Sequence, residues 1–209
     1  MPKVNSAYKE ERNNYIIDCT LEVLSEKSLE QVSMRDIIKK TGFSQGTIYN
    51  YYKNIDEIMS VIICRYMYKM KEELSACIHK NNDFYSCYHD ICNCMVNLYE
   101  NAPVLFEAML GKISYHTMKN DKQDILFEIY KVGEELNEMI IALLKMGMSQ
   151  GIVRVDLNLY VAVFHLWSSI GQTILFSHKK QYYIENQIHM PSKKYMEQGF
   201  ELIISSVTN

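Results

Sequence analysis

The chain has 209 residues, 48% of them hydrophobic, with 3 prolines and 8 glycines. This composition indicates a folded, mostly helical protein whose long helices are not interrupted by proline. The formal net charge of −3 excludes an overall basic surplus, so a nucleic-acid-binding function would have to depend on local charge.

The N-terminal 14 residues contain no apolar segment as long as a signal peptide requires. We therefore expect a cytoplasmic protein. Apolar residues then recur at helical spacing over residues 7–25, which predicts a first helix. A second, short helix is expected from Met34 to Lys40, with Ser33 as its N-cap and Gly42 as its stop, because glycine adopts a positive φ without a steric penalty.

A third helix is predicted to begin directly after Ser44, whose side chain can accept a hydrogen bond from the first turn. Two short helices joined by a tight turn that contains glycine form a helix-turn-helix, whose second helix enters the DNA major groove. The exposed face of that helix would carry Gln45, Thr47, Tyr49 and Asn50, and Gly46 would leave its start free of a bulky side chain. Many helical hairpins turn through glycine without touching DNA, so the local pattern leaves both interpretations open.

Charge near this motif favours DNA. Four basic residues and one acidic residue lie between positions 35 and 53, a local excess of three positive charges; they are Arg35, Lys39, Lys40 and Lys53 against Asp36.

The rest of the chain is helical by pattern. Asn54, followed by Glu57, predicts the cap of a long fourth helix. Further helices are expected over residues 83–100, after Pro103 to about Gly111, up to Gln150, over residues 159–177 and after Pro191, with a polar interval at residues 119–124. The pattern shows no strand alternation, so the predicted fold class is all-α: a three-helix head with a helix-turn-helix (residues 1–55) and a larger helical body (residues 56–209).

The segment of residues 159–177 contains no Asp, Glu, Lys or Arg and approaches the length of a membrane span. His165, Gln172 and Thr173 argue against a lipid-facing helix, so we interpret it as core and interface, with no membrane partner. A homodimer is predicted through residues 166–176 and 195–207, where Gly171 would permit close approach.

Six cysteines invite a metal or disulfide interpretation, since His89 and Asp90 lie among three of them. The sequence has no C-x-x-C pair, and Cys92 and Cys94 would point to opposite sides of one helix. We therefore expect buried thiols, no metal site and no cofactor.

Residues 16–58 resemble the DNA-binding head of the TetR/AcrR family of ligand-responsive transcriptional regulators. Several spaced elements carry the resemblance: the Ser33 cap, Arg35-Asp36-Ile37, Gly42, Ser44, the G-T-I-Y run at positions 46–49 and Tyr51-Tyr52. The remainder is similar to the family only in its helical architecture.

The resemblance implies that residues 56–209 form the effector-binding and dimerisation domain. It also implies operator contacts by a set of residues in the head, with Tyr49 on a phosphate: Arg35, Gln45, Thr47, Tyr49, Tyr51 and Lys53. The position of the second short helix adds Ser44, Gly46 and Asn50 to the predicted DNA-binding residues. Three positions depart from the family pattern. Ser28 stands in place of a glycine, Ile38 in place of a small residue, and Ile55 in place of a lysine that would contact phosphate.

Aromatic residues and methionine are abundant after residue 60. We expect an apolar, aromatic or flat cationic effector to be held by six residues: Tyr99, Phe106, Met109, Tyr130, His165 and Trp167. The same residue types at helical spacing also suit a packed interior.

The function predicted from sequence is a homodimeric transcriptional regulator, a repressor that a small-molecule effector releases from a palindromic operator. One alternative is a helical interaction module that has lost DNA binding, supported by Ile38 and Ile55. The other is a helical enzyme, but the sequence contains no His-Glu pair at helical spacing, phosphate loop or nucleophile motif. The sequence leaves repressor and activator undistinguished.

Overall fold

The structure is a computed structural model that describes residues 6–80, 82–111 and 124–209. Within these ranges the chain is helical and contains no β-strand, apart from an isolated antiparallel bridge between Val153 and Thr208. This confirms the all-α prediction. The expected polar interval at residues 119–124 lies outside the described residues except for Asp124.

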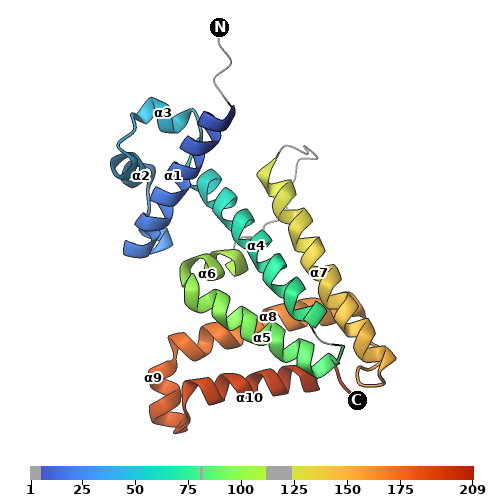
Figure 1. The fold of residues 1–209 in the computed structure, drawn as a ribbon. Helices are drawn as coiled ribbons and strands as arrows, with labels where there is room; N and C mark the ends of the chain where they lie inside the picture. Colours follow the sequence, from blue (N-terminus) through green and yellow to red (C-terminus); the bar gives the residue numbers. More distant parts are fainter. Residues whose placement is uncertain (1–5, 81, 112–123) are drawn as a thin grey trace.

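The head is built from three helices and the start of a fourth (Figure 1). They are α1 (Ser6–Glu26), α2 (Met34–Thr41), α3 (Gln45–Tyr49) and α4 (Ile55–Lys80), with a 3-10 turn at Leu29–Gln31. Their inward side chains form one apolar cluster, here called the head core: Ile16, Ile17, Val23, Leu24, Val32, Ile37, Ile48, Tyr52, Ile58, Met59 and Ile62. The head core includes residues of α4 well beyond position 55, so this helix serves both the head and the body.

The body contains the remaining helices around a second, larger apolar cluster. They are α5 (Phe84–Asn101), α6 (Pro103–Gly111), α7 (Ile125–Ser149), α8 (Leu159–Lys179), α9 (Gln181–Tyr183) and α10 (Ser192–Ser205), with a π-helical turn at Ile184–Ile188. Helix α4 packs along α7 and α5, and α10 packs along α8, as Figure 1 shows. The helix bounds lie close to those predicted from hydrophobic spacing and caps.

Close helix approach in the body depends on glycine at two positions. A Cβ atom at Gly147 would clash with Val153 and lie 2.7 Å from Cδ2 of Phe84, so only glycine lets α7 approach these residues. A Cβ atom at Gly199 would lie 2.8 Å from Cγ2 of Thr173, which allows α10 to cross close to α8.

Helix α8 is long and apolar enough to cross a bilayer, with a mean hydropathy of 1.4 over its most apolar window. In the structure its inner face packs on the body core through Leu166, Ile170 and Ile174, which are at most 3% exposed. Its outer face leaves Val161 and Phe164 exposed. Helix α8 therefore packs on the body core with one apolar face and exposes a second apolar face.

Candidate nucleic-acid interface and internal cavity

Local hydrogen bonds fix the turn between α2 and α3. Ser33 and Asp36 form a reciprocal capping box at the start of α2, and Gly42 ends this helix with φ 69° and donates its N–H to the carbonyl of Ile38 at 3.2 Å. The side chain of Ser44 then accepts the N–H of Thr47 at 3.2 Å. The end of α2, the turn and the start of α3 thus follow one another within a few residues, as the sequence predicts.

Helix α3 is held by one buried side chain and exposes the others. Ile48 is 0% exposed in the head core, whereas Gln45, Gly46 and Asn50 are exposed and Tyr49 is 45% exposed. A Cβ atom at Gly46 would meet nothing within 4 Å, so the start of the helix is open. This arrangement presents amide and phenol groups to an outside partner.

The structure brings the nine predicted DNA-contacting residues onto α2, α3 and the segment that follows. Seven are exposed and two are half-buried; the exposed ones are Arg35, Ser44, Gln45, Gly46, Tyr49, Asn50 and Lys53, and the half-buried ones are Thr47 and Tyr51. The oxygen of the Thr47 side chain lies 2.8 Å from that of Ser44, so these two hydroxyls share a hydrogen bond.

Ion pairs within the head determine which of its basic side chains are neutralised by a carboxylate. Lys40 lies 2.7 Å from Glu22, which raises the pKa of the lysine, and Asp36 lies 2.6 Å from Lys27. Hydrogen bonds from Lys27 and Ser33 lower the pKa of Asp36 to about 2. Within the described ranges the side chains of Arg35, Lys39 and Lys53 form no ion pair with a carboxylate, although the backbone N–H of Lys53 donates to Oε2 of Glu57 at 2.6 Å. Their charges therefore stay available.

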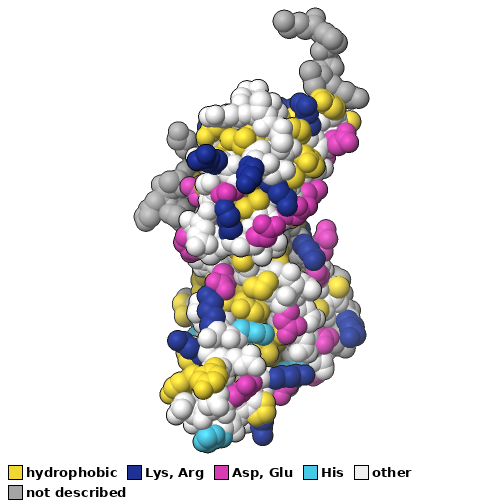
Figure 2. All heavy atoms as spheres, turned by 90° about the vertical axis from the view of Figure 1, so that its left-hand side faces the viewer, with side chains coloured by type: hydrophobic (Ala, Val, Ile, Leu, Met, Phe, Trp, Pro, Cys, Tyr) yellow, Lys and Arg dark blue, Asp and Glu magenta, His cyan; other side chains and the backbone are white. Residues whose placement is uncertain are grey.

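Lys and Arg side chains are frequent on the side of the head that Figure 2 shows, in its upper lobe. Acidic side chains are interspersed there, so this face of the head is mixed in charge. The basic character is therefore local to the motif.

Two supporting contacts of the head could not be found from the sequence. The hydroxyl of Tyr52 donates to Oδ1 of Asn13 at 2.5 Å, and Arg65 donates to Oδ1 of Asn14 at 2.7 Å. Both bonds tie α1 to residues about 40 or 50 positions away, and burial raises the pKa of Tyr52. No local pattern signals such long-range pairs.

The three departures from the family pattern have separate placements. Ser28 precedes the 3-10 turn, while Ile38 and Ile55 are half-buried and pack against the head core. Ile55 is the first residue of α4, and its packing matches an apolar role. These isoleucines therefore support the head from within.

An internal cavity of about 270 Å³ lies among α4, α5, α6, α7 and α8. Its wall is mostly apolar, and the lining residues are Met67, Met70, Met95, Met109, Leu110, Gly133, Leu136, Asn137, Phe164, Trp167, Ser168 and Gln172. Two of the six predicted effector residues, Met109 and Trp167, are among them.

The other four lie elsewhere. Tyr99 and Phe106 are buried, and the centroids of their rings lie 5.5 Å apart. The ring centroid of Tyr99 also lies 4.6 Å from that of His178. Tyr130 is 36% exposed on α7. His165 is exposed on α8, where its Nε2 lies 3.0 Å from Oγ of Ser206 on the segment after α10. The structure thus distributes these four over the core and the surface, outside the lining of the cavity.

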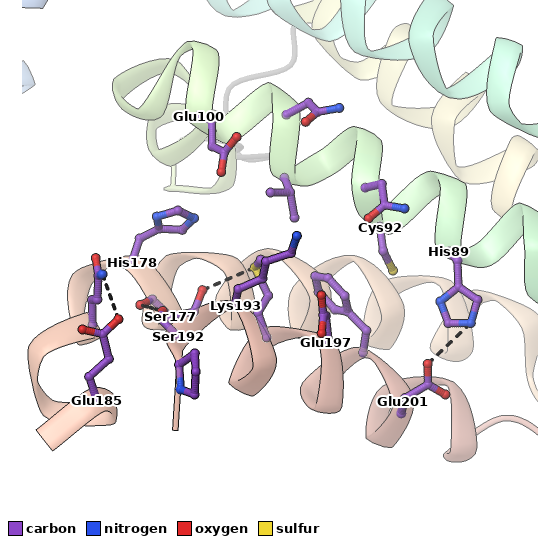
Figure 3. Close-up of a pocket in the computed structure, with 17 residues that line it drawn as sticks. His89, Cys92, Glu100, Ser177, His178, Glu185, Ser192, Lys193, Glu197 and Glu201 are labelled. Carbon is purple, nitrogen blue, oxygen red and sulfur yellow. Dashed lines mark hydrogen bonds and ion pairs between the residues drawn. The ribbon is translucent and has the colours of Figure 1, made fainter. Parts of the chain in front are cut away.

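A larger groove of about 890 Å³ runs between α5 and the α8 to α10 region (Figure 3). Its lining includes Glu100, Glu185, Glu197 and Glu201 but also Lys193, and His89 Nε2 lies 3.4 Å from Oε1 of Glu201. None of the six effector residues predicted from sequence lines this groove. It is wider than the internal cavity and more polar, and it touches neither α6 nor the head.

The cysteines lie inside the protein, except for half-buried Cys77. Burial raises the pKa of Cys92 and Cys94 to about 12, so both thiols stay protonated at neutral pH. Among the residues that the structure describes, no group of three or more His, Cys, Asp or Glu side chains could hold a metal ion.

Comparison with known proteins identifies the head. Residues 16–62 match the family model described as bacterial regulatory proteins, tetR family. The HTH-type transcriptional regulator YvdT of Bacillus subtilis (strain 168) is 31% identical over 86 residues, which make up 41% of this chain and 42% of that relative. The curated match therefore covers less than half of either protein.

Solved structures extend the likeness to the whole fold. A transcriptional regulator of the TetR/AcrR family from Thermobifida fusca YX-ER1 has a TM-score of 0.65 at 18% identity, over 93% of this chain and 97% of that one. The transcriptional regulator FadR from Bacillus subtilis, in complex with stearoyl-CoA, has a TM-score of 0.67 at 18% identity, over 92% and 98% of the two chains. At this identity the likeness establishes the shared fold.

Proposed function

The chain belongs to the TetR family of helix-turn-helix transcriptional regulators, and we propose that it is a homodimeric, cytoplasmic repressor released from a palindromic DNA operator by a small-molecule effector. The family is one of regulators, in agreement with the prediction that the chain is not an enzyme. The observation that carries the proposal is the exposed face of α3 beside unpaired basic side chains of the head.

The proposed DNA contacts follow from that face. Gln45 and Asn50 have amide groups that can read base edges, and the Tyr49 hydroxyl can donate to a phosphate. Arg35 and Lys53 supply positive charge next to α3, and their side chains form no ion pair with the carboxylates that the structure describes. Because Ile48 anchors α3 in the head core, these side chains are presented from a fixed helix.

The proposed dimer uses the outer faces of α8 and α10. Val161, Phe164 and Phe176 on α8 are 65%, 53% and 44% exposed, and Leu202 on α10 is 73% exposed. A two-fold contact sets like residues near each other, so a charged face would repel itself, whereas α8 has no charged residue between positions 159 and 177. Burial of these apolar side chains would stabilise the pair.

The proposed effector response uses α6. Val104 and Leu105 of this helix pack against the head core, and Met109 and Leu110 line the internal cavity. A ligand in the cavity would therefore touch the helix that supports the head, and it would favour the arrangement of α6 to which it binds more tightly. The similarly folded FadR forms a complex with stearoyl-CoA, which supports a response of this fold to a small-molecule effector.

A gel-shift titration tests the proposal, with the full chain and the DNA upstream of its own gene at stated salt. We expect a shift that a double variant, Gln45→Ala with Asn50→Ala, abolishes while its circular dichroism spectrum stays unchanged. Light scattering at micromolar concentration should give the mass of a dimer.

The interaction module without DNA binding remains the second candidate, motivated by Ile38 and Ile55. A dimer that gives no shift with any upstream fragment would support that candidate and refute the repressor. A monomer in solution would refute the two-fold geometry instead.

A further inference from the structure

Gly133 lies inside α7, far from either end, although glycine is among the least favourable residues in a helix interior. A Cβ atom there would meet only Cε of Met67, at an ordinary contact distance of 3.7 Å. Packing therefore requires glycine at Gly147 and Gly199 but not at Gly133. Gly133 lines the internal cavity, so the absence of a side chain there leaves the cavity larger.

Among the described residues that line the cavity, none has an ionisable side chain. Four methionines line it, namely Met67, Met70, Met95 and Met109, and their flexible, polarizable side chains adapt to ligands of irregular shape. A charged group buried against such a wall would lose its hydration without gaining a partner. The wall therefore selects for an uncharged molecule.

Two amide side chains provide the polar contacts. Asn137, 7% exposed, accepts the indole N–H of Trp167 at 3.2 Å and donates to Oε1 of Glu134 at 3.1 Å. An amide nitrogen has two hydrogens, so Asn137 can donate one further hydrogen bond. Gln172 has no hydrogen-bond partner among the described residues, and its side chain is free to turn toward a ligand at the cavity edge.

The cavity opens through α8. Its α8 lining includes Phe164, Ser168 and Gln172, and all three are also exposed to solvent. They belong to the same outer face that carries Val161 and Phe176, which is the face of the proposed dimer. A second copy packed on this face would cover the opening.

We propose that the cavity binds an uncharged, mostly apolar small molecule with one hydrogen-bond acceptor, that Gly133 keeps the site large enough for it, and that α8 of a second copy closes the opening. The inference rests on the proposed function for its dimer face. The acceptor, a carbonyl or ether oxygen, takes the remaining N–H of Asn137, and the apolar part lies along the methionines. Ligand and dimer then stabilise each other, because the second copy covers the part of the ligand that the opening would otherwise leave in water.

The first experiment uses the uncharged naphthalene ketone 6-propionyl-2-dimethylaminonaphthalene, whose emission moves to shorter wavelength in an apolar site. We expect wild type to bind it, Gly133→Leu to bind at least about tenfold more weakly, and Ala142→Leu to bind as wild type does. Ala142 is exposed on the same helix, so the control places a leucine on α7 outside the cavity.

Thermal melts of both leucine variants show whether each is folded. Equal binding by a folded Gly133→Leu variant, or no binding by wild type, would overturn the site. The anionic probe anilinonaphthalene sulfonate should bind wild type at least about tenfold more weakly than the ketone, and equal affinity would overturn the selection for an uncharged ligand. The operator gel shift is independent of these results, so the proposed function can survive either failure.

The second experiment tests the shared opening with Leu202→Glu, which places like charges across the dimer face without touching the cavity wall. We expect a monomer by light scattering and an affinity for the ketone weaker by about fivefold or more. Unchanged affinity in a monomeric variant would overturn closure by the second copy. A Leu202→Glu variant that stays dimeric would refute both the proposed dimer face and the closure of the opening by a second copy. The chemical class of the ligand would then be judged by the Gly133→Leu experiment alone.

Discussion

The helix caps of the head and the packing of the body differ in the sequence distance over which their contacts act. In the head, Ser44 with Thr47 and Asn54 with Glu57 are cap pairs three residues apart. In the body, the hydroxyl of Tyr88 donates to the carbonyl of Phe200, 112 positions away, at 2.8 Å. The head motif is thus specified by neighbouring residues, whereas the body is specified by pairs that meet only after folding.

The largest effect is expected from the body core. Phe106→Ala removes a ring that is 0% exposed and should lower the free energy of unfolding by about 3–5 kcal/mol. Urea denaturation followed by circular dichroism measures it, with Tyr85→Ala, at a 40% exposed position, as the control. A loss below about 1 kcal/mol would mean that α6 does not hold the body together.

A smaller loss is expected where the body requires close approach. Gly147→Ala forces a methyl group against Phe84 and Val153 and should cost about 1–3 kcal/mol by overpacking. The same denaturation experiment applies, with Gly111→Ala as the control because a Cβ atom there meets nothing within 4 Å. If both variants unfold alike, α7 has room that the structure does not show.

The head should respond in DNA affinity and not in stability. Tyr49→Phe removes one exposed hydroxyl and should weaken operator binding by about 1 kcal/mol without altering the melt. Thr47→Ala should also weaken binding, but Thr47 shares a hydrogen bond with Ser44, so part of its effect acts through the cap. Gel shifts that are unchanged for both variants would show that α3 does not face the duplex.

A gain in stability is expected at the cavity. Gly133→Ala adds a Cβ atom that fits beside Met67 and should raise the free energy of unfolding by about 0.5–1 kcal/mol, because alanine favours the helix. Urea denaturation of this variant beside wild type measures the change. A destabilised variant would show that the body tolerates no atom in the cavity.

The smallest effect is expected in the head, on its stability at acidic pH. The pKa of Asp36 is lowered to about 2, first by its hydrogen bond from Lys27 and then by those from Ser33. Since the folded pKa lies below the ordinary value of 3.8, its stabilising contribution is present above about pH 4 and is lost as the pH falls toward 2. Asp36→Asn should remove this component from a melting-temperature profile between pH 5 and 2, and an identical profile would show that the capping box adds nothing.

The same contrast explains what could be predicted from sequence. The capping residues, Gly42 and the exposed face of α3 follow from short-range rules and a family resemblance, and the structure places them as expected. The effector residues were chosen by type alone, and only Met109 and Trp167 line the cavity. His165 and Tyr130 could not be placed because their surroundings come from helices distant in sequence.

The position of Ile55 shows the same limit within the head. Sequence left two roles open, a missing phosphate contact or packing under the head, and the structure shows the side chain half-buried against the head core. Ile55→Lys is therefore expected to lower the melting temperature. Whether it also steepens the salt dependence of DNA binding separates the two roles.

Helix α4 contributes to both the head core and the cavity wall, so a small tilt at the cavity produces a larger displacement at the head. Ile55 and Met67 are both in this 26-residue helix, and 12 residues of helix span about 18 Å. A tilt of about 5° at Met67 would then move the head end by about 1.6 Å, and by about 3 Å between two heads related by a two-fold axis. Successive major grooves are about 34 Å apart, so a displacement too small to disturb the packing of the body is large enough to be measured as a mismatch with DNA.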